Sequence, residues 1–297
     1  MQLVKPSNNN TQIYRINGEI RLRCKTDTFC VGGLSFDENV PYKGLTLNQL
    51  SGNWKQLVEE HLQIATDLVS KEPADLLNYG VPVDFIGNST LVKTCIPIPI
   101  SCLVRGYSDS RGHKLDKAIY LPFMKNRGNL DPFKSLQQEI LYLSDFIKKK
   151  LNLSSDAEVE LEAQELSECV ENVSREVYEF MHEYALKRGL ILAETQLNFG
   201  FIRNSNSGEY ELALINDVGI PDEETIFWDA ETFNKKEYQV ALHEILSSRK
   251  YATQIICDEQ LVSMQSYIYA MIFKHILEKD VIEVSTGIMW DCYKILF

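Results

Sequence analysis

The stretch that most constrains the fold of this chain is residues 189–227, because it combines two strand-like runs with a short polar connection. The runs cover residues 190–201 and 210–218. Asn, Ser and Gly in the connection, residues 203–208, accept turn geometry readily. The pattern therefore predicts an antiparallel hairpin.

This hairpin carries polar side chains on a face where a core strand would carry apolar ones. Alternate side chains of a strand share a face, so Glu194, Gln196 and Asn198 lie together on the first strand. The second strand ends in Asn216-Asp217, just before a turn. Side-chain oxygens on neighbouring strands are suited to hold a phosphate through Mg²⁺. A solvated hairpin face is the alternative interpretation.

Length and composition are those of an ordinary globular protein. The 297 residues suffice for one large domain or two moderate ones, with 44% hydrophobic and 24% charged residues. The net charge of −12 argues against a nucleic-acid binder, because phosphate affinity is built from clustered Lys and Arg. Seven cysteines without a CxxC pair predict reduced thiols. With no apolar run of about 20 residues and no recognisable signal peptide, we expect a cytoplasmic protein without membrane contact.

Strand and helix patterns alternate along the rest of the chain. The pair Asn17-Gly18 predicts a tight turn, with short strands over residues 12–23 and 25–34. A continuous apolar strand is predicted over residues 94–105. Apolar residues at helical spacing predict helices over residues 45–70, 133–151, 157–188, 236–247 and 258–279. We expect the apolar tail, residues 281–297, to pack on the body or on another subunit of a homo-oligomer.

Several ordered blocks resemble the SAICAR synthetase family, the ATP-dependent ligases of purine biosynthesis. AETQLNFG and, after a turn, LINDVGIPDEETIFW are similar to the family's ADTKFEFG and DEVLTPDSSRFW. Residues 26–44 align with TDRISAYDVIMENSIPEKG, and residues 94–107 resemble KLIPLEVIVRGY. The resemblance implies an α+β, two-lobed fold. Residues 1–103 would form a β-rich lobe that covers a nucleotide, and residues 104–297 a larger lobe built on the hairpin and closed by the C-terminal helices.

The resemblance also implies roles for individual residues. The family's metal-binding carboxylates fall on Asn198, Asn216 and Asp217, so Asp217 is the main expected ligand of Mg²⁺. ATP is expected between the first strands and the hairpin, where Gln196 stands in place of the family's Lys. Its adenine would pair with the backbone of a hinge at Ser101, Cys102 and Leu103. Arg105 and Asp217 are the expected catalytic residues, and the residues expected to bind substrate are Asp27, Lys43, Arg105, Ser110 and Arg111.

The chain departs from the family's motifs in three places. Asn10 and Gln12 replace basic residues near the ATP phosphates, two Asn replace metal carboxylates, and the substrate wall is altered at Thr28, Cys30 and Gly33. The function implied is a ligase that joins a carboxylate of the imidazole ribotide type to an amino acid such as aspartate. Two alternatives stay open: a ligase with another substrate, and a catalytically silent relative that binds nucleotide or serves as an interaction protein. The grouped losses predict little product from the family's own substrates.

Overall fold

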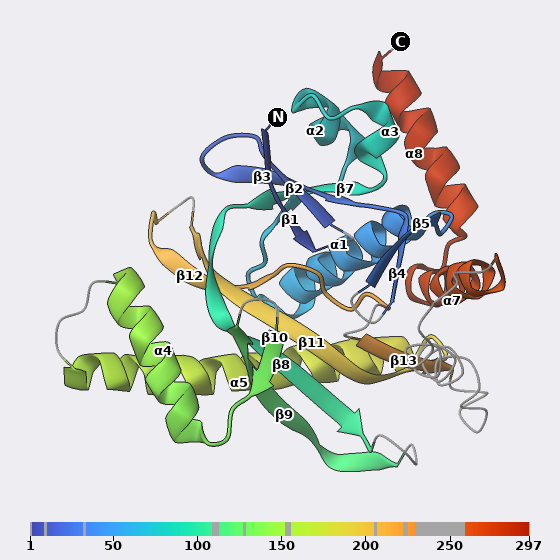
Figure 1. Cartoon of the computed structure of the whole chain (residues 1–297). Helices are drawn as coiled ribbons and strands as arrows, with labels where there is room; N and C mark the ends of the chain where they lie inside the picture. The colour runs from blue at the N-terminus through green and yellow to red at the C-terminus, as the bar shows by residue number, and fades with distance from the viewer. Residues whose placement is uncertain are drawn as a thin grey trace.

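In the computed structural model the chain folds around two antiparallel sheets (Figure 1). The structure describes residues 2–8, 11–31, 34–108, 113–126, 129–151, 156–204, 207–221, 225–229 and 259–296. The first sheet has the strand order β1-β2-β3-β7-β6. Its strands are β1 (Gln2–Asn8), β2 (Thr11–Arg15), β3 (Ile20–Lys25), β6 (Leu68–Ser70) and β7 (Ser89–Lys93). A separate pair is formed by β4 (Thr28–Val31) and β5 (Leu34–Asn39).

The second sheet contains the predicted hairpin at one edge. Its order is β10-β9-β8-β11-β12, and β13 also pairs with β11. The pairing of β11 with β12 is antiparallel and runs from Asn198↔Ile215 to Arg203↔Tyr210, which confirms the hairpin. The strands are β8 (Cys95–Tyr107), β9 (Lys114–Asn126), β10 (Asn129–Pro132), β11 (Leu190–Arg203), β12 (Tyr210–Ile215) and β13 (Thr225–Asp229).

Helices cover this sheet and join it to the first one. The long helix α5 packs on β11 and β8, and α4 lies against α5 (Figure 1). Val177 and Met181 of α5 share one core with Leu197 and Phe199 of β11, and Trp54 of α1 joins the same core. Burial of each such side chain contributes about 1.5–3 kcal/mol. The helices are α1 (Lys43–Leu62), α2 (Pro73–Asn78), α3 (Val83–Ile86), α4 (Leu136–Leu151), α5 (Asp156–Leu186), α7 (Glu259–Leu277) and α8 (Val281–Leu296).

Two predicted boundaries are wrong. The helix expected over residues 45–70 ends at Leu62, because Gln63 adopts a left-handed φ of 57° and the chain continues toward β6. At the N-terminus the turn at Asn17-Gly18 is confirmed, but it separates β2 from β3 rather than lying inside one strand. The Oδ1 atom of Asn17 accepts hydrogen bonds from the N–H groups of Glu19 and Ile20, which stabilises this turn. The helix expected over residues 236–247 lies outside the described residues.

The tail packs on the body along one face. Cys292 of α8 is buried in a small core with Leu22 and Leu91 of the first sheet, and α8 runs beside α2 and α3 (Figure 1). Its other face exposes Ile282, Met289, Trp290 and Tyr293. Within the described ranges, no helix is both long and apolar enough to cross a membrane.

Candidate active site

The candidate site lies where the first sheet meets the end of β12. Asp67 joins the two elements, because its N–H donates to the Leu214 carbonyl at 3.1 Å and its carbonyl accepts from the Lys93 N–H at 2.7 Å. The chain turns away at Asn216, whose φ of 64° is left-handed, a conformation that Asn tolerates better than most residues. The Asn216 N–H donates to Asp67 Oδ2 at 3.2 Å. This turn presents residues 216 and 217 to the first sheet.

Strand β3 supplies two cations to this junction. Leu22 packs in the small core beneath α8, so Arg23 and Lys25 project from the opposite side of their strand. The Nζ atom of Lys25 donates to Asp217 Oδ2 at 2.5 Å and to Thr11 Oγ1 at 2.9 Å. The Nη2 atom of Arg23 lies 3.3 Å from Asp67 Oδ2 and 3.1 Å from Asn216 Oδ1.

Helix α1 contributes a third cation, Lys55. The Nζ atom of Lys55 donates to Asp67 Oδ1 at 2.6 Å. We call Arg23, Lys25, Lys55, Asp67, Asn216 and Asp217 the buried charge cluster. Its ion pairs join three cations to two carboxylates, so these groups carry a net positive charge. The side chains of Lys25, Lys55 and Asp67 are only 1–2% exposed, while that of Asp217 is 22% exposed.

The electrostatics of the cluster keep Asp217 ionised. Burial by itself would raise the pKa of Asp217, but the charges of Lys25 and Arg23 outweigh it and lower that pKa from 3.8 to about 2. Burial lowers the pKa of Lys55, although Asp67 opposes that change. The Nη1 atom of Arg23 is buried and has no hydrogen-bond partner among the described residues. The cluster therefore holds one buried donor that a ligand oxygen could satisfy.

The residues expected to bind Mg²⁺ do not fit that ion. Asp217 accepts from Lys25, and Asn216 Oδ1 accepts from Arg23. Asn198 Oδ1 accepts from Ser101 Oγ at 3.0 Å. Across the described parts of the chain, no group of three or more His, Cys, Asp or Glu side chains could hold a metal ion. Each predicted ligand thus accepts from a protein donor through one oxygen, and that donor competes with Mg²⁺, which prefers carboxylate, phosphate and water oxygens in an octahedron.

A second polar region lies on one face of the large sheet. Arg105 of β8 and Glu194 of β11 are directly opposite in the ladder, and the Arg105 Nε atom donates to Glu194 Oε2. Ladder partners share a face, so this ion pair, Gln196 and Asn198 lie on one side of the sheet, as predicted. Arg105 is 30% exposed. Glu194 and Asn198 are four residue steps apart along the strand, which corresponds to about 13 Å.

The segment expected to be a hinge lies inside the second sheet. Ser101, Cys102 and Leu103 pair with β11 on one side and with β9 on the other. Ser101 and Cys102 are fully buried, and burial raises the pKa of the Cys102 thiol to about 11. The chain leaves the first sheet near Thr94, before β8 begins. Because β8 has a strand on each side here, its main chain does not form an open edge for adenine.

Two of the expected substrate residues hold the start of α1. The Asp27 Oδ1 atom accepts from the Gly44 N–H at 2.6 Å. Lys43 is fully buried, donates to the Thr28 carbonyl at 3.0 Å and lies 5.9 Å from the centre of the Tyr269 ring. These contacts anchor α1 against its neighbours. Ser110 and Arg111, the other expected substrate contacts, lie outside the described residues.

Sequence reasoning did not identify four members of the charge cluster. Arg23 and Lys25 alternate with Leu22 and Cys24, so the strand pattern alone could have placed both cations on one face. Lys55 resembles any lysine on the polar side of a helix. Asp67 was assigned to a helix that ends earlier, because nothing in the sequence marks the left-handed turn at Gln63.

Comparisons with known proteins place the chain in one family. The SAICAR synthetase family profile matches residues 10–249. The phosphoribosylaminoimidazole-succinocarboxamide synthase of Geobacter sulfurreducens is 29% identical over 229 residues, which cover 73% of this chain and 72% of the relative. That of Pichia angusta is 26% identical over 293 residues, with 94% and 92% covered.

Solved structures agree with this assignment at the level of the fold. The SAICAR synthase of Saccharomyces cerevisiae, complexed with SAICAR, matches with a TM-score of 0.69 at 19% identity and covers 94% of this chain and 96% of its own. A SAICAR synthetase in complex with ADP matches with a TM-score of 0.60 at 20% identity, covering 92% and 97%. These matches confirm the predicted α+β fold. The chain belongs to the SAICAR synthetase family, the ligases of purine biosynthesis.

Proposed function

We propose that this chain is an ATP-dependent ligase of the SAICAR synthetase type, which joins a carboxylate to an amine. The observation that carries the proposal is the buried charge cluster at the meeting point of the two sheets, where ATP is expected. Its three cations exceed its two carboxylates, so the site attracts the anionic phosphates of a nucleotide. The ADP held by one solved relative supports this choice of ligand.

The proposed reaction needs charge neutralisation more than covalent chemistry from the protein. ATP would convert the substrate carboxylate into an acyl phosphate, and the amine would then displace phosphate to form an amide. Groups with fixed positive charge stabilise the negative charge that develops in such steps. Arg23 and Lys25 supply that charge beneath the proposed nucleotide.

Arg105 is the proposed contact for an anionic group on the substrate. Its guanidinium is partly exposed and bonded to Glu194, and a phosphate group could replace that carboxylate as its acceptor. An imidazole ribotide carboxylate with aspartate is the proposed substrate pair. Thr28 and Cys30 replace residues of the family's substrate wall, so we expect slower turnover of this pair than in the Geobacter sulfurreducens relative.

A catalytically silent nucleotide-binding protein is the second candidate. It is favoured by one specific observation: both residues expected to be catalytic are bonded to groups of the chain itself. Asp217 is bonded to Lys25, and Arg105 is bonded to Glu194. If neither pair opens when ligands bind, nucleotide would be held without turnover.

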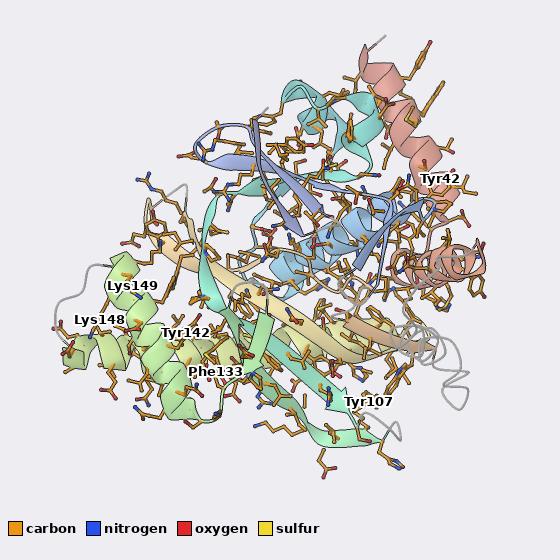
Figure 2. All side chains as sticks on the ribbon, viewed as in Figure 1. Tyr42, Tyr107, Phe133, Tyr142, Lys148 and Lys149 are labelled. Atoms are coloured by element: carbon orange, nitrogen blue, oxygen red, sulfur yellow. The ribbon has the colours of Figure 1, made fainter. Side chains whose placement is uncertain are left out.

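Product formation from the imidazole carboxylate, aspartate and ATP separates the candidates, with the relative assayed in parallel. The ligase proposal predicts ATP consumption that requires both co-substrates and falls at least tenfold in Arg105→Ala, because a lost charged contact removes roughly 1.5–3 kcal/mol. The matched control is Lys149→Ala, since Lys149 is exposed on α4, away from the first sheet (Figure 2). Nucleotide binding without turnover of any carboxylate and amine pair would support the silent candidate. Absence of nucleotide binding would contradict both.

A further inference from the structure

Lys25 occupies the position at which a cation would meet Asp217. Asp217 is the only carboxylate among the three expected metal ligands. The Lys25 ammonium lies 2.5 Å from its Oδ2 atom, and a second bond to Thr11 Oγ1 fixes the direction of the lysine side chain. Lys25 is 2% exposed, so this contact is part of the packed interior and not a chance surface pair.

While Lys25 is in place, the net positive charge of the cluster opposes the entry of a further cation. Arg23 and Lys55 are both bonded to Asp67, and their charges already exceed what that carboxylate neutralises. A divalent ion at Asp217 would add two positive charges beside three buried ones. Like charges repel more strongly where burial limits the screening by water. The ion would also have to displace Lys25 from its hydrogen bonds.

Arg23 provides an independent sign that an anion belongs here. Its side chain is 8% exposed, and its Nη1 atom is buried without a hydrogen-bond partner among the described residues. A buried donor without an acceptor is costly, and the Nη1 group of this guanidinium can still donate a hydrogen bond. A phosphate oxygen would satisfy this donor.

We propose that the Lys25 ammonium is a built-in cation that takes the place of a divalent metal ion at Asp217, so that the chain binds nucleotide without one. The nucleotide part rests on the proposed function, whereas the part concerning Asp217 rests on the contacts of Lys25 alone. Arg23 and Lys25 together then face the phosphates that a metal ion would otherwise neutralise.

Two measurements on the unaltered protein test the proposal. The first is the affinity for ADP by calorimetry, once with MgCl₂ and once with EDTA, and we expect the two dissociation constants to agree within about twofold. The second is a titration of Mn²⁺ followed by electron paramagnetic resonance, in which we expect no binding to the nucleotide-free protein. ADP binding that is about tenfold or more tighter with Mg²⁺ would overturn the proposal. So would Mn²⁺ binding that Asp217→Asn removes.

A pair of variants makes the test specific. Lys25→Met keeps a long side chain but frees Asp217, so Mn²⁺ binding should appear and ADP binding should become dependent on Mg²⁺. Lys55→Met is the matched control, because it removes a buried lysine of the same cluster while Arg23 still holds Asp67 and Lys25 still holds Asp217. We expect no Mn²⁺ binding in that control. Circular dichroism verifies that both variants fold, and the measurements on the unaltered protein decide the question if they do not.

The outcomes distinguish this proposal from the proposed function. If ADP does not bind in either buffer, the proposed function fails, and the Mn²⁺ titrations alone decide the role of Lys25. Mn²⁺ binding by Lys25→Met but not by the unaltered protein would then support the built-in cation. Mn²⁺ binding by neither protein would overturn it, because Asp217 would not be a latent metal ligand.

Discussion

The buried charge cluster and the Arg105–Glu194 pair are two ion-paired regions of the proposed site, and they differ in their exposure to water. In the cluster, Lys25, Lys55 and Asp67 are almost completely buried. Arg105 is 30% exposed and Glu194 is 15% exposed. A buried ion that loses its partner has no water to replace it, whereas a partly exposed ion does. The cluster therefore acts as fixed structure, while the Arg105 pair can exchange one partner for another.

This difference assigns different tasks to the two regions. The fixed charges of the cluster suit a ligand group that does not vary from one proposed catalytic cycle to the next, such as the phosphates of a nucleotide. The exchangeable pair suits a substrate that must enter and leave. The comparison also predicts that removing one charge will affect stability in the cluster and ligand affinity at Arg105.

The largest effect is expected from Asp67→Asn, which would break the cluster at its centre. The change leaves Arg23 and Lys55 buried without their shared counter-charge. We expect the free energy of unfolding to fall by about 3–5 kcal/mol. Urea denaturation measures it, with Asp156→Asn at an exposed ion pair as the control. A loss below about 1 kcal/mol would mean that the cluster contributes no more to stability than the exposed Lys148–Asp156 pair.

The turn that positions Asp217 should be nearly as sensitive. Gly219 has a φ of +58°, and an added Cβ would lie 2.4 Å from Met181 Cε and 2.5 Å from Trp54 Cδ1. We expect Gly219→Ala to cost about 2–3 kcal/mol, because it combines backbone strain with overpacking. Gly18→Ala is the control, since a Cβ there meets no atom within 4 Å. Equal melting temperatures for the two variants would show that the turn adapts freely.

Acid should reveal the Lys25–Asp217 bond. The pKa of Asp217 is lowered from 3.8 to about 2, so its contribution to stability is fully present above pH 3.8 and is lost as the pH falls through about 2. The loss over that window amounts to roughly 2 kcal/mol. Unfolding free energies of the unaltered protein and of Asp217→Asn should converge as the pH falls. A constant difference between the two unfolding free energies from pH 5 to pH 2 would contradict the lowered pKa of Asp217.

The smallest effect on stability is expected from Arg105→Ala. Exposure to water limits the value of its ion pair to about 1 kcal/mol or less. Glu194→Gln sharpens the comparison, because it leaves the guanidinium without its carboxylate and should tighten the binding of an anionic substrate. Calorimetry with the imidazole ribotide carboxylate measures that change. Weaker binding in Glu194→Gln would show that Glu194 helps to hold the substrate.

The sequence predicted secondary structure correctly where the spacing of apolar residues or a turn dipeptide identified the element. The alternation in β11 and the helical spacing in α5 predicted both elements, and Asn17-Gly18 predicted its turn. The end of α1 was not predicted, because Gln63 adopts a left-handed conformation and glutamine is not a residue type that indicates one. The charge cluster was missed because its ion pairs join residues that are far apart in the sequence, such as Lys25 and Asp217. Only the packing of α1 and β3 against the end of β12 brings them together.

The most direct test of the account is a crystal structure of the chain grown with ADP and MnCl₂, with anomalous data to locate manganese. We predict that the ADP phosphates lie beside Arg23 and Lys25, that the Lys25 ammonium stays on Asp217, and that no anomalous peak appears at that carboxylate. A manganese ion bound to Asp217, with Lys25 displaced from it, would contradict the account.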